Sequence, residues 1–314
     1  ISTRDWSSDV CSSDLGTLGG LAAGGAVARN PKAAPVPDVA ASSVAPVRPR
    51  LGLALGGGSA RGFAHIGVLK SLDQAGIRPD VVAGTSAGSL VGAFYAAGWS
   101  PWQIEELALG VREAEVADFA SAGRRGMMVG DALTKLVNER LKGQRIETMK
   151  LRFAAVATDL KSGEIAVLRQ GPVGEAVRAS CSIPGVFVPK DLNGRELVDG
   201  GLTSPLPVRT ARQMGADVVI AVDVAARPRR QEFPGLYEVI LQSFEIMGRA
   251  LADQEGLQAD LVIRPETGQY GSADFSVRRE MIQAGYEAAQ ALLPELRRRL
   301  EGPPRPRRPA RTPA

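Results

Sequence analysis

Short apolar runs alternate with stretches of helical periodicity along most of this 314-residue chain, and this alternation constrains the fold more than any other feature. The first run, LGLAL at residues 51–55, is bounded by glycines and predicts a buried strand. Further strands are predicted at Asp80–Ala83, Phe153–Thr158, Ile165–Leu168, Glu196–Val198, Val218–Val222 and Leu261–Ile263. Helices are predicted at Ala60–Ala75, Ala87–Ala97, Gly130–Leu141, Glu175–Ala179, Val208–Met214, Leu236–Glu255 and Val277–Leu300, with one more beginning at Ser100. We therefore expect an α/β protein, a single three-layer αβα domain with a mainly parallel central sheet, which binds ligands at the carboxyl ends of its strands.

Local signals mark the ends of two predicted helices. Ser59 is expected to cap the first helix, and Gly76 is expected to end it. Ser100-Pro101-Trp102-Gln103 carries a capping-box pattern with a proline at the first helical position. These signals place a loop between each helix and its neighbours.

Composition excludes several other classes of protein. With 44% apolar and 23% charged residues the chain can form a sizeable core, so disorder throughout is excluded. Its 36 glycines and 21 prolines show no short period, which excludes collagen, solenoid repeats and coiled coil. Residues 301–314 hold four arginines and one glutamate, so most of the net charge of +4 comes from a tail, and we expect no nucleic-acid partner. No apolar run approaches the roughly 20 residues that a membrane-spanning helix needs.

Composition also divides the chain into segments. The uncharged stretch Leu15–Val27 ends in an Ala-Val-Ala pattern; as a signal-peptide remnant it places the protein in the cell envelope or periplasm, and as a small-residue linker in the cytoplasm. The predicted segments are a non-native artefact at 1–15, a signal remnant and Pro/Ala-rich linker at 16–49, a globular domain at 50–300 with a motif core at 51–224 and a helical C-terminal extension at 236–300, and a basic disordered tail at 301–314.

Histidine and cysteine are too scarce for most metal sites. The single histidine, His65, excludes every multi-histidine site, and its place in an apolar part of a predicted helix is typical of a structural imidazole. The two cysteines, Cys11 and Cys181, stand far apart without a C-x-x-C pair, so neither a zinc site nor a disulfide framework is indicated. We expect no metal and no organic cofactor.

A G-x-S-x-G motif, Gly84-Thr85-Ser86-Ala87-Gly88, lies between an apolar run and an alanine-rich predicted helix. In a nucleophile elbow, small residues flank a serine on a sharp strand-to-helix turn, which places its hydroxyl at the top of the sheet. Ser86 is therefore the candidate nucleophile, with Gly84 and Gly88 as the motif glycines. The motif alone is also compatible with an ordinary glycine-rich turn.

Three consecutive glycines, Gly56, Gly57 and Gly58, follow the first strand and precede a helix. Such a loop exposes backbone N–H groups at a helix N-terminus and can hold a phosphate or an oxyanion. Neither G-x-x-x-x-G-K-[ST] nor G-x-G-x-x-G fits, so all three glycines are predicted to donate to an oxyanion. Arg61, in the same loop, is expected to support the loop or contact substrate, and a surface or salt-bridged arginine is the alternative.

A serine nucleophile needs a general base. Because His65 is the single histidine and is predicted to have a structural role, a Ser-His-Asp triad is not expected. An aspartate acting directly on the serine is then the best choice. Asp199 is selected because it ends a short apolar strand and precedes Gly200 and Gly201, which allow close approach to another loop. The Asp-Gly pair is also compatible with a hairpin turn. Other candidate bases after Ser86 are Asp159, Asp217 and Asp223.

Together, and in this order, the motifs resemble those of the bacterial patatin-like phospholipases, or lipid acyl hydrolases. GGGSARG is similar to the family's oxyanion loop, GTSAG to its nucleophile elbow and DGG to its catalytic aspartate motif. Ala179–Pro184, ASCSIP, also resembles a family block between elbow and aspartate. The resemblance spans residues 51 to about 224 and implies a Ser86–Asp199 dyad with oxyanion N–H groups from the glycine loop.

The resemblance also implies an activity, the hydrolysis of carboxylic esters in phospholipids, lysophospholipids or related acyl lipids through an acyl-enzyme. The implied partners are a lipid or acyl-ester substrate and a membrane surface contacted peripherally, while the oligomeric state stays open. The alternative is a non-catalytic lipid- or phosphate-binding regulatory protein that uses the same glycine loop. Turnover of an ester that depends on Ser86 separates the two.

Overall fold

The computed structural model describes residues 48–112, 115, 116, 118–121, 125–225, 235–271 and 273–301. The predicted artefact, the signal remnant and linker up to residue 47, and the predicted tail from residue 302 lie outside the described residues. Contacts of the fold begin before residue 50, because Arg48 forms an ion pair with Asp80 in which Nη2 lies 2.7 Å from Oδ1.

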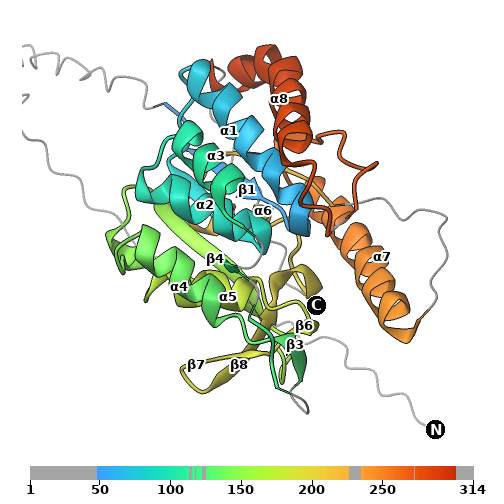
Figure 1. Ribbon diagram of the computed structural model, residues 1–314. Helices are drawn as coiled ribbons and strands as arrows, with labels where there is room; N and C mark the ends of the chain where they lie inside the picture. The colour runs from blue at the N-terminus through green and yellow to red at the C-terminus, as the bar shows by residue number, and fades with distance from the viewer. Residues whose placement is uncertain are drawn as a thin grey trace, which may run out of the picture. The chain divides into compact units, whose positions relative to one another are not determined.

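The central sheet of the described chain has the strand order β10-β9-β1-β2-β4-β8-β7, with β5 also paired to β4. Figure 1 shows β4 between β1 and the paired strands β7 and β8. Leu55 of β1 pairs with Gly84 on one side and with Val222 on the other, so the carboxyl ends of three strands meet at one edge. The parallel strands are β1 (Leu51–Leu55), β2 (Val81–Thr85), β4 (Arg152–Asp159), β9 (Val218–Val222) and β10 (Leu261–Ile263). The predicted parallel core is confirmed.

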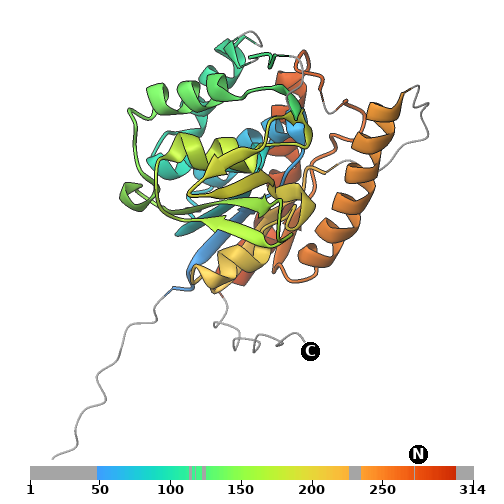
Figure 2. The same ribbon diagram turned by 90° about the horizontal axis from the view of Figure 1, so that it is seen from below.

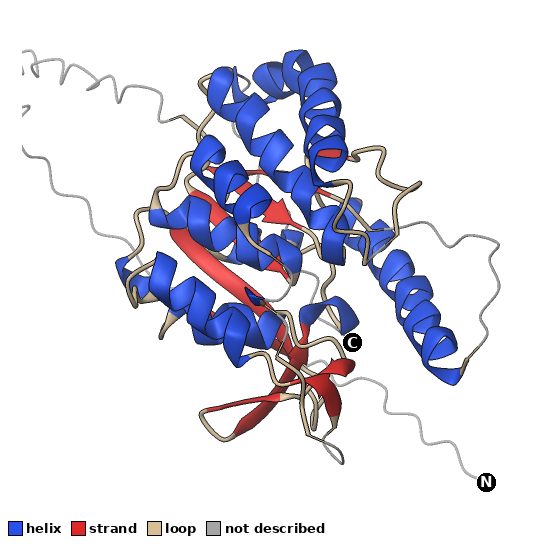
Figure 3. Cartoon of the chain, in the orientation of Figure 1, coloured by secondary structure: helices blue, strands red, loops and turns tan. Residues whose placement is uncertain are grey.

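Antiparallel strands complete the sheet beside β4. β5 (Ile165–Leu168) and β8 (Arg195–Asp199) pair with β4, and β7 (Lys190–Leu192) pairs with β8. The β7–β8 hairpin turns at Asn193 and Gly194, which both have positive φ, as two-residue hairpins require. A separate sheet of β3 (Gly126–Met128) and β6 (Gly185–Phe187) lies at the same end of the fold as the β7–β8 hairpin (Figure 3). The sequence does not predict β3, β6 and β7, which are three residues long and contain glycine or charged residues, unlike the equally short but wholly apolar β10.

Helices cover both faces of the sheet (Figure 2). Leu51, Leu53 and Leu55 of β1 share one core with the helices of the first face, and Ala54 packs with those of the second. The first face carries α1 (Ala64–Gln74), α2 (Ala87–Ala97), α3 (Pro101–Gly110), α4 (Asp131–Arg140), α5 (Val173–Ser180) and α8 (Arg278–Glu301). The second carries α6 (Val208–Gln213) and α7 (Leu236–Gly256). The three-layer αβα architecture is therefore confirmed.

The first helix begins differently from the sequence prediction. A 3-10 turn, η1 (Ser59–Phe63), precedes α1, and Gly58 occupies its N-cap position without a side-chain cap. Ser59 has a φ of 52° and does not cap the helix, so this prediction is wrong. The other end signals are confirmed, because Gly76 has a φ of 71° and Ser100 forms the predicted capping box.

Candidate active site

Ser86 lies at the sharp turn between β2 and α2, with a φ of 52° and a ψ of −126°. Positive φ strains a residue that has a side chain, and a nucleophile elbow is a place where such strain occurs. Gly84 and Gly88 permit the turn. An added Cβ would lie 2.4 Å from Gly88 O in the first case and 2.2 Å from Leu55 O in the second. The predicted strand-turn-helix setting of Ser86 is confirmed.

The backbone of Ser86 is held by two buried hydroxyl groups. Its N–H donates to Ser180 Oγ at 2.9 Å, and Ser180 Oγ donates to Val156 O at 2.5 Å. Its carbonyl accepts from Ser89 Oγ at 2.7 Å. The sequence shows Ser180 only as part of the ASCSIP block, without a role. The structure shows that this block holds the elbow in its strained conformation.

Asp199 reaches the elbow across a single strand. Thr85, the residue before Ser86, pairs with Val156 of β4, and Asp199 pairs with the next residue of that strand, Ala157. Because β8 runs antiparallel to β4 and ends at Asp199, its carboxylate arrives at the edge where β2 turns into α2. The structure thus brings together the two residues that the sequence predicts as a dyad.

Gly200 and Gly201 make this approach possible. An added Cβ on Gly200 would lie 2.2 Å from Val156 O, so no larger residue fits there. The N–H of Gly201 donates to Asp199 Oδ1 at 2.7 Å. The chain continues directly into a 3-10 turn, η4 (Gly200–Leu202), so the hairpin interpretation of the Asp-Gly pair is wrong.

The second carboxylate oxygen of Asp199, Oδ2, is buried and has no hydrogen-bond partner among the described residues. Burial raises the pKa of Asp199 to about 6, against the opposing effects of the Ser86 hydroxyl and the Gly201 N–H. The Ser86 hydroxyl is among the groups that lower this pKa, and it makes no hydrogen bond of ordinary length to Oδ2. Such contacts commonly shorten when substrate binds. The arrangement can transfer a proton from Ser86 to Asp199.

The structure corrects the oxyanion role predicted for two of the three loop glycines. The N–H of Gly56 donates to Val222 O at 3.0 Å, and the N–H of Gly57 donates to Pro205 O at 2.9 Å. Both glycines continue backbone pairing beyond the end of β1, so neither N–H is free. The N–H of Gly58 has no hydrogen-bond partner among the described residues. Gly58 is therefore the loop residue that can donate to an oxyanion.

A second N–H without a hydrogen-bond partner among the described residues belongs to Ala87, which the sequence shows as part of the motif without a role of its own. Ala87 is the first residue of α2, and the first N–H groups of a helix have no partner within it. In nucleophile elbows the residue after the serine supplies an oxyanion N–H, so the motif itself carried this signal. The glycine loop borders the elbow, because an added Cβ would lie 3.4 Å from Ser86 Cβ at Gly57 and 2.4 Å from Ala87 Cβ at Gly62.

Arg61 is bound to protein groups. Its Nη2 lies 3.0 Å from Glu245 Oε1 on α7, and its Nη1 donates to Tyr270 O at 3.5 Å. The side chain is only 6% exposed, whereas that of Glu245 is 31% exposed. The ion pair with Glu245 agrees with the alternative of a salt-bridged arginine, and it attaches the glycine loop to α7.

His65 supports the same loop from inside the core. The side chain is fully buried, and Nε2 lies 2.8 Å from Gly56 O. A carbonyl only accepts hydrogen bonds, so Nε2 carries the proton. Burial lowers the pKa of His65 to about 4, which keeps the ring neutral at neutral pH. The histidine has the structural setting that the sequence predicts.

The competing catalytic groups are engaged or inert. Cys181, which is buried and free, has a pKa raised by burial to about 12, so its thiol stays protonated. The other three candidate bases form ion pairs: Asp159 with Arg195, Asp217 with Arg50, and Asp223 with Arg249 and Arg264. Asp199 is the candidate with a buried, unpaired carboxylate oxygen.

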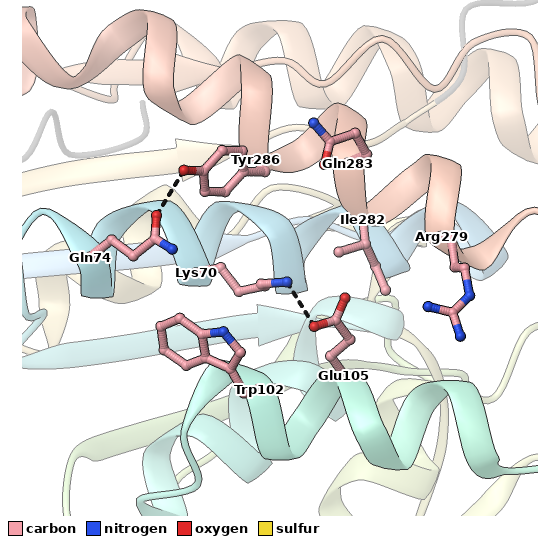
Figure 4. A pocket seen from close by; sticks show the side chains of 8 residues that line it. All are labelled: Lys70, Gln74, Trp102, Glu105, Arg279, Ile282, Gln283 and Tyr286. Atoms are coloured by element: carbon pink, nitrogen blue, oxygen red, sulfur yellow. Dashed lines mark hydrogen bonds and ion pairs between the residues drawn. The ribbon is translucent and has the colours of Figure 1, made fainter.

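Two hollows in the part of the chain that the structure describes lie away from this site. One, of about 420 Å³, borders β10 and α8. The other, of about 430 Å³, lies among α1, α3 and α8 and is lined by Lys70, Gln74, Trp102, Glu105, Arg279, Ile282, Gln283 and Tyr286 (Figure 4). Among the described residues, no cluster of three or more His, Cys, Asp or Glu side chains could hold a metal ion. None of the described helices is both long and apolar enough to span a bilayer.

Two known proteins that are similar to this chain in sequence both carry NTE in their names. An NTE family protein of Mycobacterium tuberculosis is 34% identical over 198 residues, which cover 60% of this chain and 53% of that protein. A lysophospholipase, NTE1, of Phaeosphaeria nodorum is 28% identical over 290 residues, which cover 79% of this chain and 18% of that protein. The chain thus spans about half the length of the mycobacterial relative and a smaller share of the fungal one.

A solved structure and a family model also match this chain. The crystal structure of VipD from Legionella pneumophila matches with a TM-score of 0.54 at 15% identity, over 79% of this chain and 67% of that one. This likeness concerns the fold alone. The model of the family described as patatin-like phospholipase matches residues 53–212, which include the glycine loop, the elbow and the Asp199 motif. The chain belongs to the patatin-like phospholipase family.

Proposed function

We propose that this protein is a serine lipid acyl hydrolase that cleaves carboxylic esters through a Ser86–Asp199 dyad in its 50–300 domain. The observation that carries the proposal is the buried, unpartnered Oδ2 of Asp199 beside a serine in a strained turn. Because burial raises the pKa of Asp199 to about 6, the group is ionised at neutral pH and is more basic than an exposed aspartate. A general base for a serine hydroxyl needs both properties.

In the acylation step, Asp199 Oδ2 accepts the Ser86 proton while Ser86 Oγ attacks the ester carbonyl carbon. The negative oxygen that develops is stabilised by the N–H groups of Gly58 and Ala87. Collapse of the tetrahedral intermediate breaks the ester C–O bond. The leaving alcohol takes the proton from Asp199, and the acyl group stays on Ser86.

In the deacylation step, a water molecule gives a proton to Asp199 and attacks the acyl carbonyl carbon. The same two N–H groups stabilise the second tetrahedral intermediate. Its collapse breaks the bond to Ser86 Oγ, which takes back the proton, and a carboxylic acid leaves. The cycle balances with one ester and one water consumed, and it uses no cofactor.

The family and the burial of the site support the proposed substrate class. Family membership and the name of the fungal relative, a lysophospholipase, support a phospholipid, lysophospholipid or related acyl lipid. Ser86 and Asp199 are each only 6% exposed, so the ester must enter a site from which most water is excluded. Such a substrate reaches the protein from a membrane or micelle surface, which is why we propose peripheral membrane contact.

Hydrolysis assays test the proposal on a short-chain ester and on lysophospholipid and phospholipid in mixed micelles. Ser86→Ala should lower kcat by at least about 10³-fold, as removal of a nucleophile does in serine hydrolases. Ser71→Ala is the matched control, because Ser71 is a buried serine of α1 whose hydroxyl has no partner among the described residues. Folded wild type that binds lipid or inorganic phosphate without any turnover would overturn the proposal in favour of the non-catalytic alternative.

A further inference from the structure

One short stretch, residues 203–206, is hydrogen-bonded to all three motifs of the candidate site. Pro205 O accepts from the N–H of Gly57 at 2.9 Å, and Ser204 O accepts from Thr85 Oγ1 at 2.7 Å. The N–H groups of Thr203 and Ser204 donate to Gly200 O at 3.1 and 2.8 Å. We call this stretch the 203–206 segment.

The partners of the 203–206 segment are the immediate neighbours of the reacting groups. Gly57 precedes the oxyanion donor of the glycine loop, Thr85 precedes the nucleophile, and Gly200 follows the general base. These neighbours come from the ends of three different strands: Gly57 and Gly200 follow β1 and β8, and Thr85 is the last residue of β2. A displacement of the 203–206 segment would therefore change the distances among oxyanion donor, nucleophile and base.

Glu255 on α7 fixes the 203–206 segment. Its Oε1 accepts a hydrogen bond from Ser204 Oγ, and its Oε2 accepts one from the N–H of Leu206 at 2.8 Å. These two donors flank Pro205, so a single carboxylate sets the direction of the Pro205 carbonyl. Ser204 and Leu206 are each 1% exposed, so water does not replace these bonds readily.

Attachment of α7 to the sheet does not by itself explain a glutamate at position 255. Burial raises the pKa of Glu255 to about 7, against the lowering effects of Ser204, Leu206 and the charge of Arg209. Its hydrogen-bond partners among the described residues are Ser204 and Leu206, neither of which is charged. Even a part-buried carboxylate is costly when it has no ion pair. α7 is also attached at other points, by the ion pairs of Glu245 with Arg61 and of Arg249 with Asp223. The role that distinguishes Glu255 is its pair of bonds to the 203–206 segment.

We propose that Glu255 is a positioning residue for acyl transfer. It holds the 203–206 segment in place, and the segment in turn fixes the positions of the glycine loop, the elbow and the aspartate motif relative to one another. The hydrogen bonds of Glu255 among the described residues go to Ser204 and Leu206, not to the nucleophile or the general base. The inference rests on the proposed hydrolase activity. Wild type without esterase turnover would refute that activity, whereas active wild type with an unaffected Glu255 variant would refute only this inference.

The test compares kcat, KM, melting temperature and the rate of fluorophosphonate labelling in Glu255→Ala and Glu255→Gln. Glu255→Ala should lower kcat and the labelling rate at least about ten-fold with KM changed less than about two-fold, because the reacting groups shift while the binding surface stays. Glutamine can still accept from the Leu206 N–H and donate to Ser204 Oγ, so Glu255→Gln should keep kcat within about three-fold of wild type.

Two control variants separate positioning from general destabilisation. Gln254→Ala changes the exposed neighbour of Glu255 on α7 and should leave every readout at the wild-type value. Val137→Ala opens a cavity at α4 in the core of the first face, whereas Leu206 packs in the core of the second face, and it should lower the melting temperature without lowering kcat.

Three results would overturn the inference. They are a kcat of Glu255→Ala within two-fold of wild type, equal losses in Glu255→Ala and Glu255→Gln, and an equal kcat loss in Val137→Ala. If Glu255→Ala does not fold, Ser204→Ala replaces it, since that change removes one of the two bonds and leaves the Thr85 bond to the backbone intact. A kcat of Ser204→Ala equal to wild type would then refute the inference.

Discussion

The side-chain oxygen of Ser180 accepts a 2.9 Å hydrogen bond from the backbone N–H of Ser86. Ser180 donates in turn to Val156 O on β4, the strand that lies between the elbow and Asp199. One buried hydroxyl thus connects the elbow to β4, the strand that pairs both with β2, which leads to Ser86, and with β8, which ends at Asp199. The strained conformation of Ser86 depends on a residue far along the chain.

Ser180→Ala should therefore destabilise the protein and slow acylation. The change leaves two buried backbone groups, Ser86 N–H and Val156 O, without this partner, at a cost of about 1–3 kcal/mol. Denaturant unfolding measures the loss of stability, and kcat on a short-chain ester measures the loss of activity. Ser71→Ala serves as the control, because the Ser71 hydroxyl has no partner to lose among the described residues. A Ser180→Ala protein as stable and active as wild type would contradict this role.

Asp199→Asn should abolish activity and stabilise the fold. The pKa of the aspartate rises from 3.8 to about 6 on folding, so its ionised form is disfavoured in the folded state and costs up to about 3 kcal/mol at neutral pH. This cost is absent below pH 3.8 and grows as the pH rises to 6. Asparagine carries no charge and can still accept from Gly201 N–H. Thermal unfolding at pH 4 and pH 7 should show the gain at pH 7 alone, and a lower melting temperature at pH 7 would refute it.

Activity should fall as the pH drops below about 6, because protonated Asp199 cannot accept the serine proton. At pH 5 we expect kcat/KM to be about ten-fold below its plateau, with one titrating group on the acid side. His65→Gln should keep most of the turnover and the same acid limb, since glutamine can still donate to Gly56 O. A near-complete loss of activity in His65→Gln, or a shifted acid limb, would exclude the dyad in its present form.

Arg61→Met should lower kcat by about ten-fold for a neutral ester and for a phospholipid alike, with KM little changed. The reason is that Arg61 ties the glycine loop to Glu245 on α7 and is 6% exposed in its side chain. Glu245→Gln should cause a similar loss, and the double variant should lose little more than either single one. Kinetics on both substrates provide the check. A loss confined to the phospholipid would instead assign Arg61 to the substrate phosphate.

The parts of the site that sequence could predict are those in which local chemistry decides the structure. Gly84 and Gly88 are needed because a Cβ at either position would strike the backbone, and such a requirement leaves a trace in the motif itself. The same holds for Gly200 beside Asp199. The parallel strands also follow from local pattern, since strands buried on both faces are continuously apolar.

Other parts depend on partners that are distant in sequence. Whether a loop N–H is free at Gly56 or Gly57 is decided by Val222 and Pro205, which no local pattern connects to the loop. Glu255 is one acid among several on a helix that sequence shows only as periodic. Ser59 failed as a cap because the glycine loop continues into a 3-10 turn, a conformation that capping patterns do not encode.

The central claim is that Ser86 is an activated nucleophile served by Asp199. Labelling of the intact protein with a fluorophosphonate, with the adduct located by mass spectrometry, tests it most directly, in wild type, Ser86→Ala and Asp199→Asn, in detergent and on vesicles. We predict an adduct on Ser86 in wild type, none in Ser86→Ala, and labelling slowed at least about 10²-fold in Asp199→Asn, the smallest effect expected of a lost general base. Folded wild type without an adduct on vesicles, or undiminished labelling of Asp199→Asn, would contradict the account.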